Sequence, residues 1–155
     1  MNDETVQPGM EETVLEAIRE QAVLDSSLFL LAAGDERDVS LEAFGQDHPD
    51  QFLAPALSAK ETVLLAAGLA LSGRRVLVHS LSPLLVFQAY DAIRSAIAIP
   101  SLPVGFLLAR AGFTGGEDGT LSQVLEDLAF LRVLPNVSVL VPSDSPSAGQ
   151  LFREA

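Results

Sequence analysis

Two parts of the sequence carry side chains whose types suit chemistry. His79 ends an apolar run, where an imidazole can transfer protons, although a structural histidine with a satisfied hydrogen bond is the favoured interpretation. Arg110 stands just before a Gly-rich loop, Gly112 to Gly119, and its planar guanidinium can hold a carboxylate or a phosphate. A salt bridge from Arg110 to Glu117 or Asp118 is an equal alternative.

Several common catalytic motifs are missing from the chain. It contains no Cys, which excludes disulfides, thiolate nucleophiles and Cys-ligated metals. Ser80, Ser82 and Ser122 lie in no GxSxG motif, so a nucleophile elbow is not indicated. The run GGEDG at 115–119 is neither a dinucleotide fingerprint nor a P-loop. It is either a ligand-binding loop or, more simply, an acidic turn.

The charge of the chain limits its partners. The 155 residues carry a formal net charge of −12 at pH 7, which disfavours nucleic acids and anionic membranes because both are bound through Lys and Arg. The acidity indicates solubility or a basic partner.

The N-terminal residues lack the basic and apolar pattern of a signal peptide, and no apolar run is long enough to span a bilayer. We therefore expect a soluble cytoplasmic protein.

The hydrophobic pattern alternates between strand and helix along the chain. Short apolar runs predict buried strands at 27–33, 76–80, 104–109 and 137–141. Helical spacing and capping residues predict helices at 11–22, 58–71, 82–97, 122–132 and 145–155. This order predicts one three-layer α/β domain, a mainly parallel sheet with helices on both faces, over 11–155 after a flexible segment at 1–10.

The predicted sheet gives the candidate residues a common place. In such folds ligands gather at the carboxyl ends of the strands. Those ends carry residues 34–35, 79–80, 110–112 and 142–144. The residues alone therefore predict a site at this edge and leave its chemistry open.

Several sequence blocks occur in a fixed order between Phe44 and Ser143. The most specific is AGFTGGEDG at 111–119. The others are HPDQF at 48–52, AAGLALSG at 66–73, AYDAIR at 89–94, LEDLA at 125–129, LRVLPNV at 131–137 and PSD at 142–144. In order and spacing, these blocks resemble the pyrimidine-binding (Pyr) domain of transketolases, and they are similar to the equivalent region of deoxyxylulose-phosphate synthases.

The resemblance implies a cofactor and a second domain. In the family, thiamine diphosphate lies between the Pyr domain and a pyrophosphate-binding (PP) domain, which holds Mg²⁺ and the diphosphate with a G-D-G motif and a later Asn. This sequence has no such motif with a correctly spaced Asn. The resemblance therefore implies a separate PP-domain subunit, in a dimer or heterotetramer. The assembled enzyme would transfer a two-carbon ketol or acyl unit from a small ketose or 2-oxo donor.

Positions that bind the cofactor in the family are changed here. The family Glu that bonds the pyrimidine N1′ matches Ala59, which can neither donate nor accept that bond. Glu61 lies two residues further, and on a helix it faces elsewhere unless the register shifts. The family aromatics that stack on the pyrimidine match Leu81 and Leu84, while Phe87 keeps a third aromatic position.

Positions that contact substrate in the family are changed as well. The family histidines there match Arg110 and Ser122, whereas Asp118 is retained. Two interpretations stay open: a specialised subunit of a split enzyme, or a catalytically silent domain kept for interaction or regulation. The resemblance implies a cofactor pocket lined by Ala59, Leu81, Leu84, Phe87 and Asp118, with substrate contacts from His79 for proton transfer, Arg110 for anion binding, and Ser122.

Overall fold

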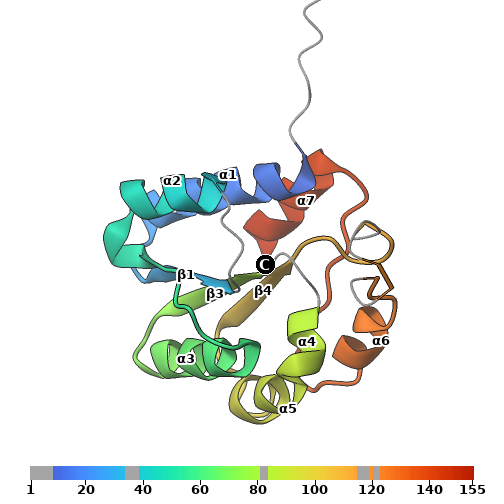
Figure 1. The fold of residues 1–155 in the computed structure, drawn as a ribbon. Coiled ribbons are helices and arrows are strands. Elements are labelled where there is room, and N and C mark those ends of the chain that lie inside the picture. Colours follow the sequence, from blue (N-terminus) through green and yellow to red (C-terminus); the bar gives the residue numbers. More distant parts are fainter. Residues whose placement is uncertain (1–8, 34–38, 81–83, 115–118, 121–122) are drawn as a thin grey trace, which may run out of the picture.

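The fold is built on one parallel sheet. A computed structural model describes residues 9–33, 39–80, 84–114, 119–120 and 123–155 (Figure 1). Within them, four strands pair in the order β2-β1-β3-β4. They are β1 (Leu28–Ala33), β2 (Phe52–Leu53), β3 (Arg75–Ser80) and β4 (Val104–Leu108). All neighbours are parallel, and the register places Ala33, Ser80 and Leu108 level with one another at the carboxyl edge.

Helices cover both faces of the sheet. One face carries α1 (Met10–Leu24), α2 (Val39–Asp47) and α7 (Ser145–Glu154). The other carries α3 (Ala59–Leu71), α4 (Leu84–Gln88), α5 (Tyr90–Ala92) and the π-helical turn η2 (Ile93–Ala98). The short helix α6 (Asp127–Arg132) lies beside α4, and the 3₁₀ turn η1 (Pro49–Gln51) leads into β2. The predicted α/β fold with a parallel sheet between helical layers is confirmed.

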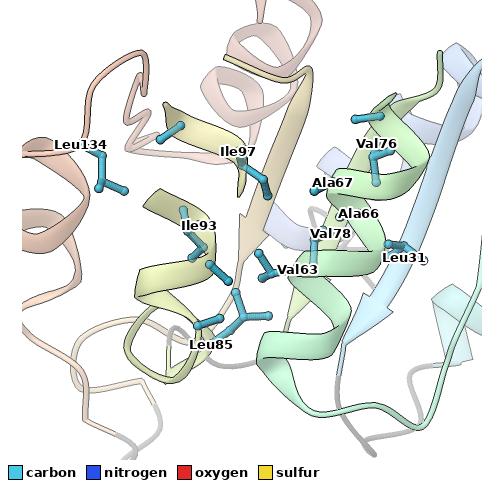
Figure 2. Close-up of a cluster of buried hydrophobic side chains, with 14 residues drawn as sticks. Leu31, Val63, Ala66, Ala67, Val76, Val78, Leu85, Ile93, Ile97 and Leu134 are labelled. Atoms are coloured by element: carbon cyan, nitrogen blue, oxygen red, sulfur yellow. The ribbon is translucent and has the colours of Figure 1, made fainter. Parts of the chain in front are cut away.

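Alternation along the strands divides the core into two clusters. Leu31, Val76 and Val78 point toward α3 and η2, where they pack with residues such as Val63 and Ile93 (Figure 2). Strand residues of the other parity, such as Leu30, pack on the opposite face with α1 and α2. A side chain's position along its strand therefore decides which helical layer it meets.

The predicted strand at 137–141 is wrong for this structure. The segment belongs to no helix or strand, and it forms no ladder with any described strand. Leu140 is 49% exposed and Val141 is 65% exposed, so the run is not enclosed between two layers. An apolar run becomes a buried strand only when a neighbouring strand takes up its backbone hydrogen bonds, and that requirement is not visible in its composition.

Two predicted helices have different limits from those expected. The helix predicted at 122–132 begins only at Asp127, because the carbonyl of Val124 accepts a loop hydrogen bond from the Gly112 N–H (2.9 Å). The helix predicted at 82–97 is interrupted at Ala89, whose φ of −121° and ψ of 14° leave the helical region. Beyond it the chain widens into η2, where the Ile99 N–H donates to the Arg94 carbonyl (3.0 Å) in the i→i+5 pattern.

The helix α2 and the short strand β2 were not predicted. Only Leu41 and Phe44 of α2 are buried in the core, so its apolar pattern is short. Gly45 lowers its helix propensity further. The turn that follows is held by Gln51, whose side-chain amide donates to the Asp25 and Leu28 carbonyls (2.9 and 3.0 Å). This link is a long-range contact, so local sequence patterns do not reveal it.

Gly45 makes a close approach that predicts a stability effect. A Cβ added there would overlap the Phe52 ring, whereas a Cβ at Gly68 in α3 would meet nothing within 4 Å. Gly45→Ala should therefore lower the free energy of unfolding by about 1–2 kcal/mol, despite the better helix propensity of Ala. Gly68→Ala, the matched control, should raise it by about 0.5–1 kcal/mol. Urea unfolding measures both, and equal effects would contradict the packing explanation.

Two further features concern the N-terminal boundary of the domain and membrane-spanning helices. Residues 1–8 lie outside the described part of the chain, so the boundary between a flexible segment at 1–10 and a domain at 11–155 stays a prediction. Among the described helices, none is both long and apolar enough to cross a membrane.

Candidate functional site

The topology brings several predicted site residues to the carboxyl edge of the sheet. Ser80 ends β3, and Arg110 follows β4 by two residues. Helix α3 returns from this edge to the start of β3, so Ala59 at its first position lies at the same edge. Helix α4 also starts here, at Leu84. The edge therefore carries the first turns of two helices on the α3 side of the sheet.

Ala59 lies in a helix start that is already closed by its neighbours. Ser58 is the N-cap of α3, and its backbone N–H and hydroxyl both donate to Oε2 of Glu61 (3.0 and 2.7 Å). The Glu61 N–H donates in return to the Ser58 hydroxyl (3.4 Å). This reciprocal capping box engages the Glu61 carboxylate, so Glu61 does not replace the carboxyl that Ala59 lacks.

The capping box predicts how Glu61 titrates. The Ser58 hydroxyl first, and then its backbone N–H, hold the pKa of Glu61 below its usual value of 4.5. Because the folded pKa is lowered, the carboxylate stabilises α3 at neutral pH, and that contribution is lost as the pH falls through the folded value. We expect NMR titration to give a Glu61 pKa below 4.5 in the native chain and a higher pKa in Ser58→Ala. An unchanged pKa in Ser58→Ala would contradict the capping box.

Phe87 is engaged with the helix α6. It is half-buried, and its ring meets the Phe130 ring edge-on at 5.0 Å between centroids. Phe130 also meets Tyr90 edge-on at 5.4 Å, and the Tyr90 hydroxyl donates to the Phe130 carbonyl (3.1 Å). The ring that the resemblance assigns to the cofactor pocket therefore packs in an aromatic cluster that joins α4 and α5 to α6.

His79 points to the other face of the sheet. It is 1% exposed, and its Nε2 lies 2.8 Å from Oε1 of Glu11, in the first turn of α1. Its strand neighbour Leu77 packs in the cluster beneath α1 and α2, whereas Ala59 packs in the cluster beneath α3. The structure thus separates His79 from Ala59 by the thickness of the sheet, which favours a structural role for this histidine.

Arg110 is exposed at the carboxyl edge in a special backbone conformation. Its φ is 53°, in the left-handed region that Arg rarely adopts, and Gly112 follows with a φ of 67°. The Gly112 N–H donates to the Val124 carbonyl, which closes the loop after β4. This turn places Arg110 at the carboxyl edge, where its guanidinium can bind an anionic group.

The remaining predicted residues cannot be placed. Leu81, Asp118 and Ser122 lie outside the described residues, and of Leu84 only the backbone is described. Within the described ranges, no three His, Asp or Glu side chains converge on a position that could hold a metal ion. The Arg74-Arg75 pair lies at the opposite edge, where Arg75 bonds Asp25 (3.1 Å) and Arg74 lies over the Phe29 ring.

The sequence did not reveal the residues that contact His79 and Phe87. Glu11 lies 68 residues before His79, and only the return of α1 across the sheet brings them together. Phe130 lies 43 residues after Phe87 on a helix that was expected to be longer. The acidic first turn of α1 was the available signal, because a Glu there can reach over the edge of the sheet.

The fold and the edge define a class: a parallel α/β domain that presents a candidate ligand site at the carboxyl ends of its strands. Residues 7–155 match the family model described as "Transketolase, pyrimidine binding domain". The chain therefore belongs to the transketolase pyrimidine-binding domain family, as the sequence blocks had indicated.

The chain spans less than half the length of the relatives that it is compared with here. It is 34% identical over 150 residues to 1-deoxy-D-xylulose-5-phosphate synthase of Pectobacterium atrosepticum, covering 97% of this chain and 24% of the relative. It is 32% identical over 139 residues to a putative transketolase C-terminal section of Methanocaldococcus jannaschii, covering 90% of this chain and 44% of the relative. The fold is similar to a solved split gene transketolase in an inactive beta4 tetramer, with TM-score 0.82, 24% identity, and coverage of 96% and 48%.

Proposed function

We propose that this domain is the Pyr side of a split transketolase-like enzyme and that a separate PP-domain subunit completes the active site. Membership of the pyrimidine-binding family carries the proposal. The assembled enzyme transfers a two-carbon ketol or acyl unit from a ketose or 2-oxo donor, with thiamine diphosphate and a partner-held Mg²⁺. The complex is a dimer or a heterotetramer.

The kinds of protein that this chain resembles support a divided enzyme. One relative is itself named a C-terminal section, and the fold is similar to that of a split gene transketolase. The acidic surface fits a partner that offers cations, because the net charge is −12. Both observations favour a second subunit over a domain that works alone.

The described residues do not fit thiamine diphosphate in the manner that the family uses. Ala59 has no polar atom at the position of the family Glu, and the carboxylate of Glu61 is engaged by Ser58. The Phe87 ring packs on Phe130. We therefore derive no catalytic step from this chain, and the partner or a rearranged pocket must supply the contact to the pyrimidine.

This disagreement supports a second candidate function. A Pyr domain without the carboxyl can serve as a catalytically silent subunit that binds or regulates an active relative. The complete capping box favours it, because a helix start with satisfied donors is stable without a ligand. The two candidates share the partner and differ in whether cofactor is turned over.

Arg110 is proposed as the anion contact of the assembled site. Arg110→Ala should raise the KM for a phosphorylated donor about tenfold, because a guanidinium–phosphate pair contributes more than a neutral hydrogen bond. Arg110→Gly should raise the KM by the same factor. It should also unfold at a higher temperature than Arg110→Ala, since Gly adopts the φ of 53° without strain. Steady-state kinetics of the complex and thermal unfolding test both parts. An unchanged KM would remove this role from Arg110.

Cofactor titration tests the division of labour between the subunits. We expect isothermal titration of thiamine diphosphate and Mg²⁺ into the isolated chain to show no binding, and the complex with the PP-domain subunit to bind. Saturable binding by the isolated chain, at micromolar concentration, would contradict the proposed function.

A further inference from the structure

Three aromatic rings join α6 to the helices beside it (Figure 1). The Phe130 ring of α6 meets the Phe87 ring of α4 edge-on at 5.0 Å and the Tyr90 ring of α5 edge-on at 5.4 Å. The Tyr90 hydroxyl also donates to the Phe130 carbonyl (3.1 Å). Phe130 therefore engages both helices that follow the carboxyl edge on this side of the sheet.

Helix α6 is weakly anchored apart from these contacts. Asp127 is buried, whereas Leu128 is 42% exposed and Phe130 is 41% exposed. Of the residues in α6, Leu131 packs against the buried cluster beneath α3. A helix of six residues is too short to be stable without packing, and an element with few buried contacts can open locally while the sheet stays folded.

Helix α4, in contrast, is fixed to the core. Leu85 and Val86 are buried, and so is Ala89, directly after the helix. Its backbone cannot shift without unpacking these residues. Phe87 lies between them and is half-buried, with its ring against Phe130. A change in the position of this ring is therefore a rotation about χ1 from one staggered rotamer to another.

Such a rotation keeps the Phe87 ring near the candidate site. On a helix, both favoured χ1 rotamers lay the side chain over the preceding turn, toward the N-terminus. The turn before Phe87 starts at Leu84, at the carboxyl edge. One rotamer places the ring against Phe130, as in the structure, and the other turns it away from α6 and exposes its face at this edge.

We propose that Phe130 makes an autoinhibitory contact with Phe87. In the closed position, which the structure shows, α6 engages the Phe87 ring. In the open position the ring stacks on a planar heteroaromatic ligand at the carboxyl edge. That this ligand is the aminopyrimidine of thiamine diphosphate rests on the proposed function. The contact itself rests on the packing of Phe130, and it accounts for the poor fit of the described pocket to that cofactor.

The autoinhibitory contact lowers the affinity of the site. A ligand that binds only the open form has an apparent Kd equal to its intrinsic Kd divided by the open fraction. If about one chain in ten is open, removal of the contact tightens binding about tenfold. Because the coupling is reciprocal, the bound ligand also loosens α6.

NMR of the isolated chain tests the contact without cofactor or partner. Three-bond couplings of the Phe87 β-protons report its χ1 rotamer. We expect one dominant rotamer in the native chain and averaging between two rotamers in Phe130→Ala. Phe130→Tyr keeps the ring at an exposed position, so it should retain the native couplings. A single, unchanged rotamer in Phe130→Ala would overturn the autoinhibitory contact.

Isothermal titration of the complex with the PP-domain subunit tests the effect on affinity. Phe130→Ala should lower the Kd for thiamine diphosphate about tenfold. Tyr90→Phe, which removes only the hydroxyl bond to α6, should lower it about threefold, and Phe130→Tyr should bind as the native chain does. A merely structural Phe130 predicts unchanged or weaker binding in Phe130→Ala, and that result would also overturn the inference. If neither the native complex nor the variants bind, the proposed function fails, and the Phe87 couplings still decide the contact.

Discussion

Ala59→Glu is expected to raise cofactor-dependent turnover of the chain with its PP-domain partner by about 100-fold or more, the scale of a positioned proton-transfer group. Ala59 is the first residue of α3, half-buried at the carboxyl edge. A carboxylate is favoured there because it lies at the positive end of the helix. The added carboxyl restores the group that the family uses against the pyrimidine.

Measuring thiamine diphosphate binding distinguishes a restored cofactor contact in Ala59→Glu from a general change in activity. Ala59→Glu should also tighten thiamine diphosphate binding to the complex in isothermal titration, whereas Ala59→Gln, of the same size and without an ionisable carboxyl, should recover little turnover. If Ala59→Glu changes neither binding nor turnover, the pocket is degenerate at other positions as well. The catalytically silent function would then be the correct one.

His79→Ala is expected to lower the free energy of unfolding by about 3 kcal/mol, through the cavity left by a buried ring. His79 is 1% exposed and bonds Glu11, which fastens the start of α1 to the end of β3. Glu11→Ala should cost about 1–2 kcal/mol, because it leaves the imidazole nitrogen unpaired in the core. Glu11→Gln keeps an acceptor and a donor, so it should cost less. Urea unfolding of the three variants gives this order.

Kinetics of the assembled enzyme distinguish this structural role from catalysis. A structural His79 predicts that Glu11→Ala and His79→Ala lower stability in proportion, with unchanged pH dependence of turnover at a temperature where both variants are folded. Loss of a titration in the pH–rate profile of His79→Ala, with native stability, would show instead that His79 transfers protons.

The fold was predictable where apolar runs are long and regular. Strands around Leu30, Val78 and Phe106 and helices around Ile18 and Ala66 appear in the sequence as two different periods, and the parallel sheet follows from their alternation. The predicted sheet indicated a site at the carboxyl edge, and the family resemblance added Ala59 to the candidate residues. The topology brings Ala59 and Arg110 to that edge.

Other features depend on contacts that no local pattern contains. The helix breaks at Ala89, directly before Tyr90, whose hydroxyl donates to the Phe130 carbonyl 40 residues away, and a π-helical turn follows. The burial of His79 depends on Glu11, a partner from the opposite end of the chain. The strand predicted at 137–141 was wrong because an apolar run becomes a strand only when a neighbouring strand takes up its backbone hydrogen bonds, and composition does not reveal this.

Affinity capture of the tagged chain, from the cells that make it, tests whether a separate PP-domain subunit exists. Mass spectrometry identifies the captured proteins, and a thiamine diphosphate assay follows the cofactor in the eluate. We predict a second chain that carries a G-D-G motif with a later Asn, co-eluting with thiamine diphosphate. Elution of the chain alone, or with unrelated proteins and no cofactor, would contradict the split enzyme.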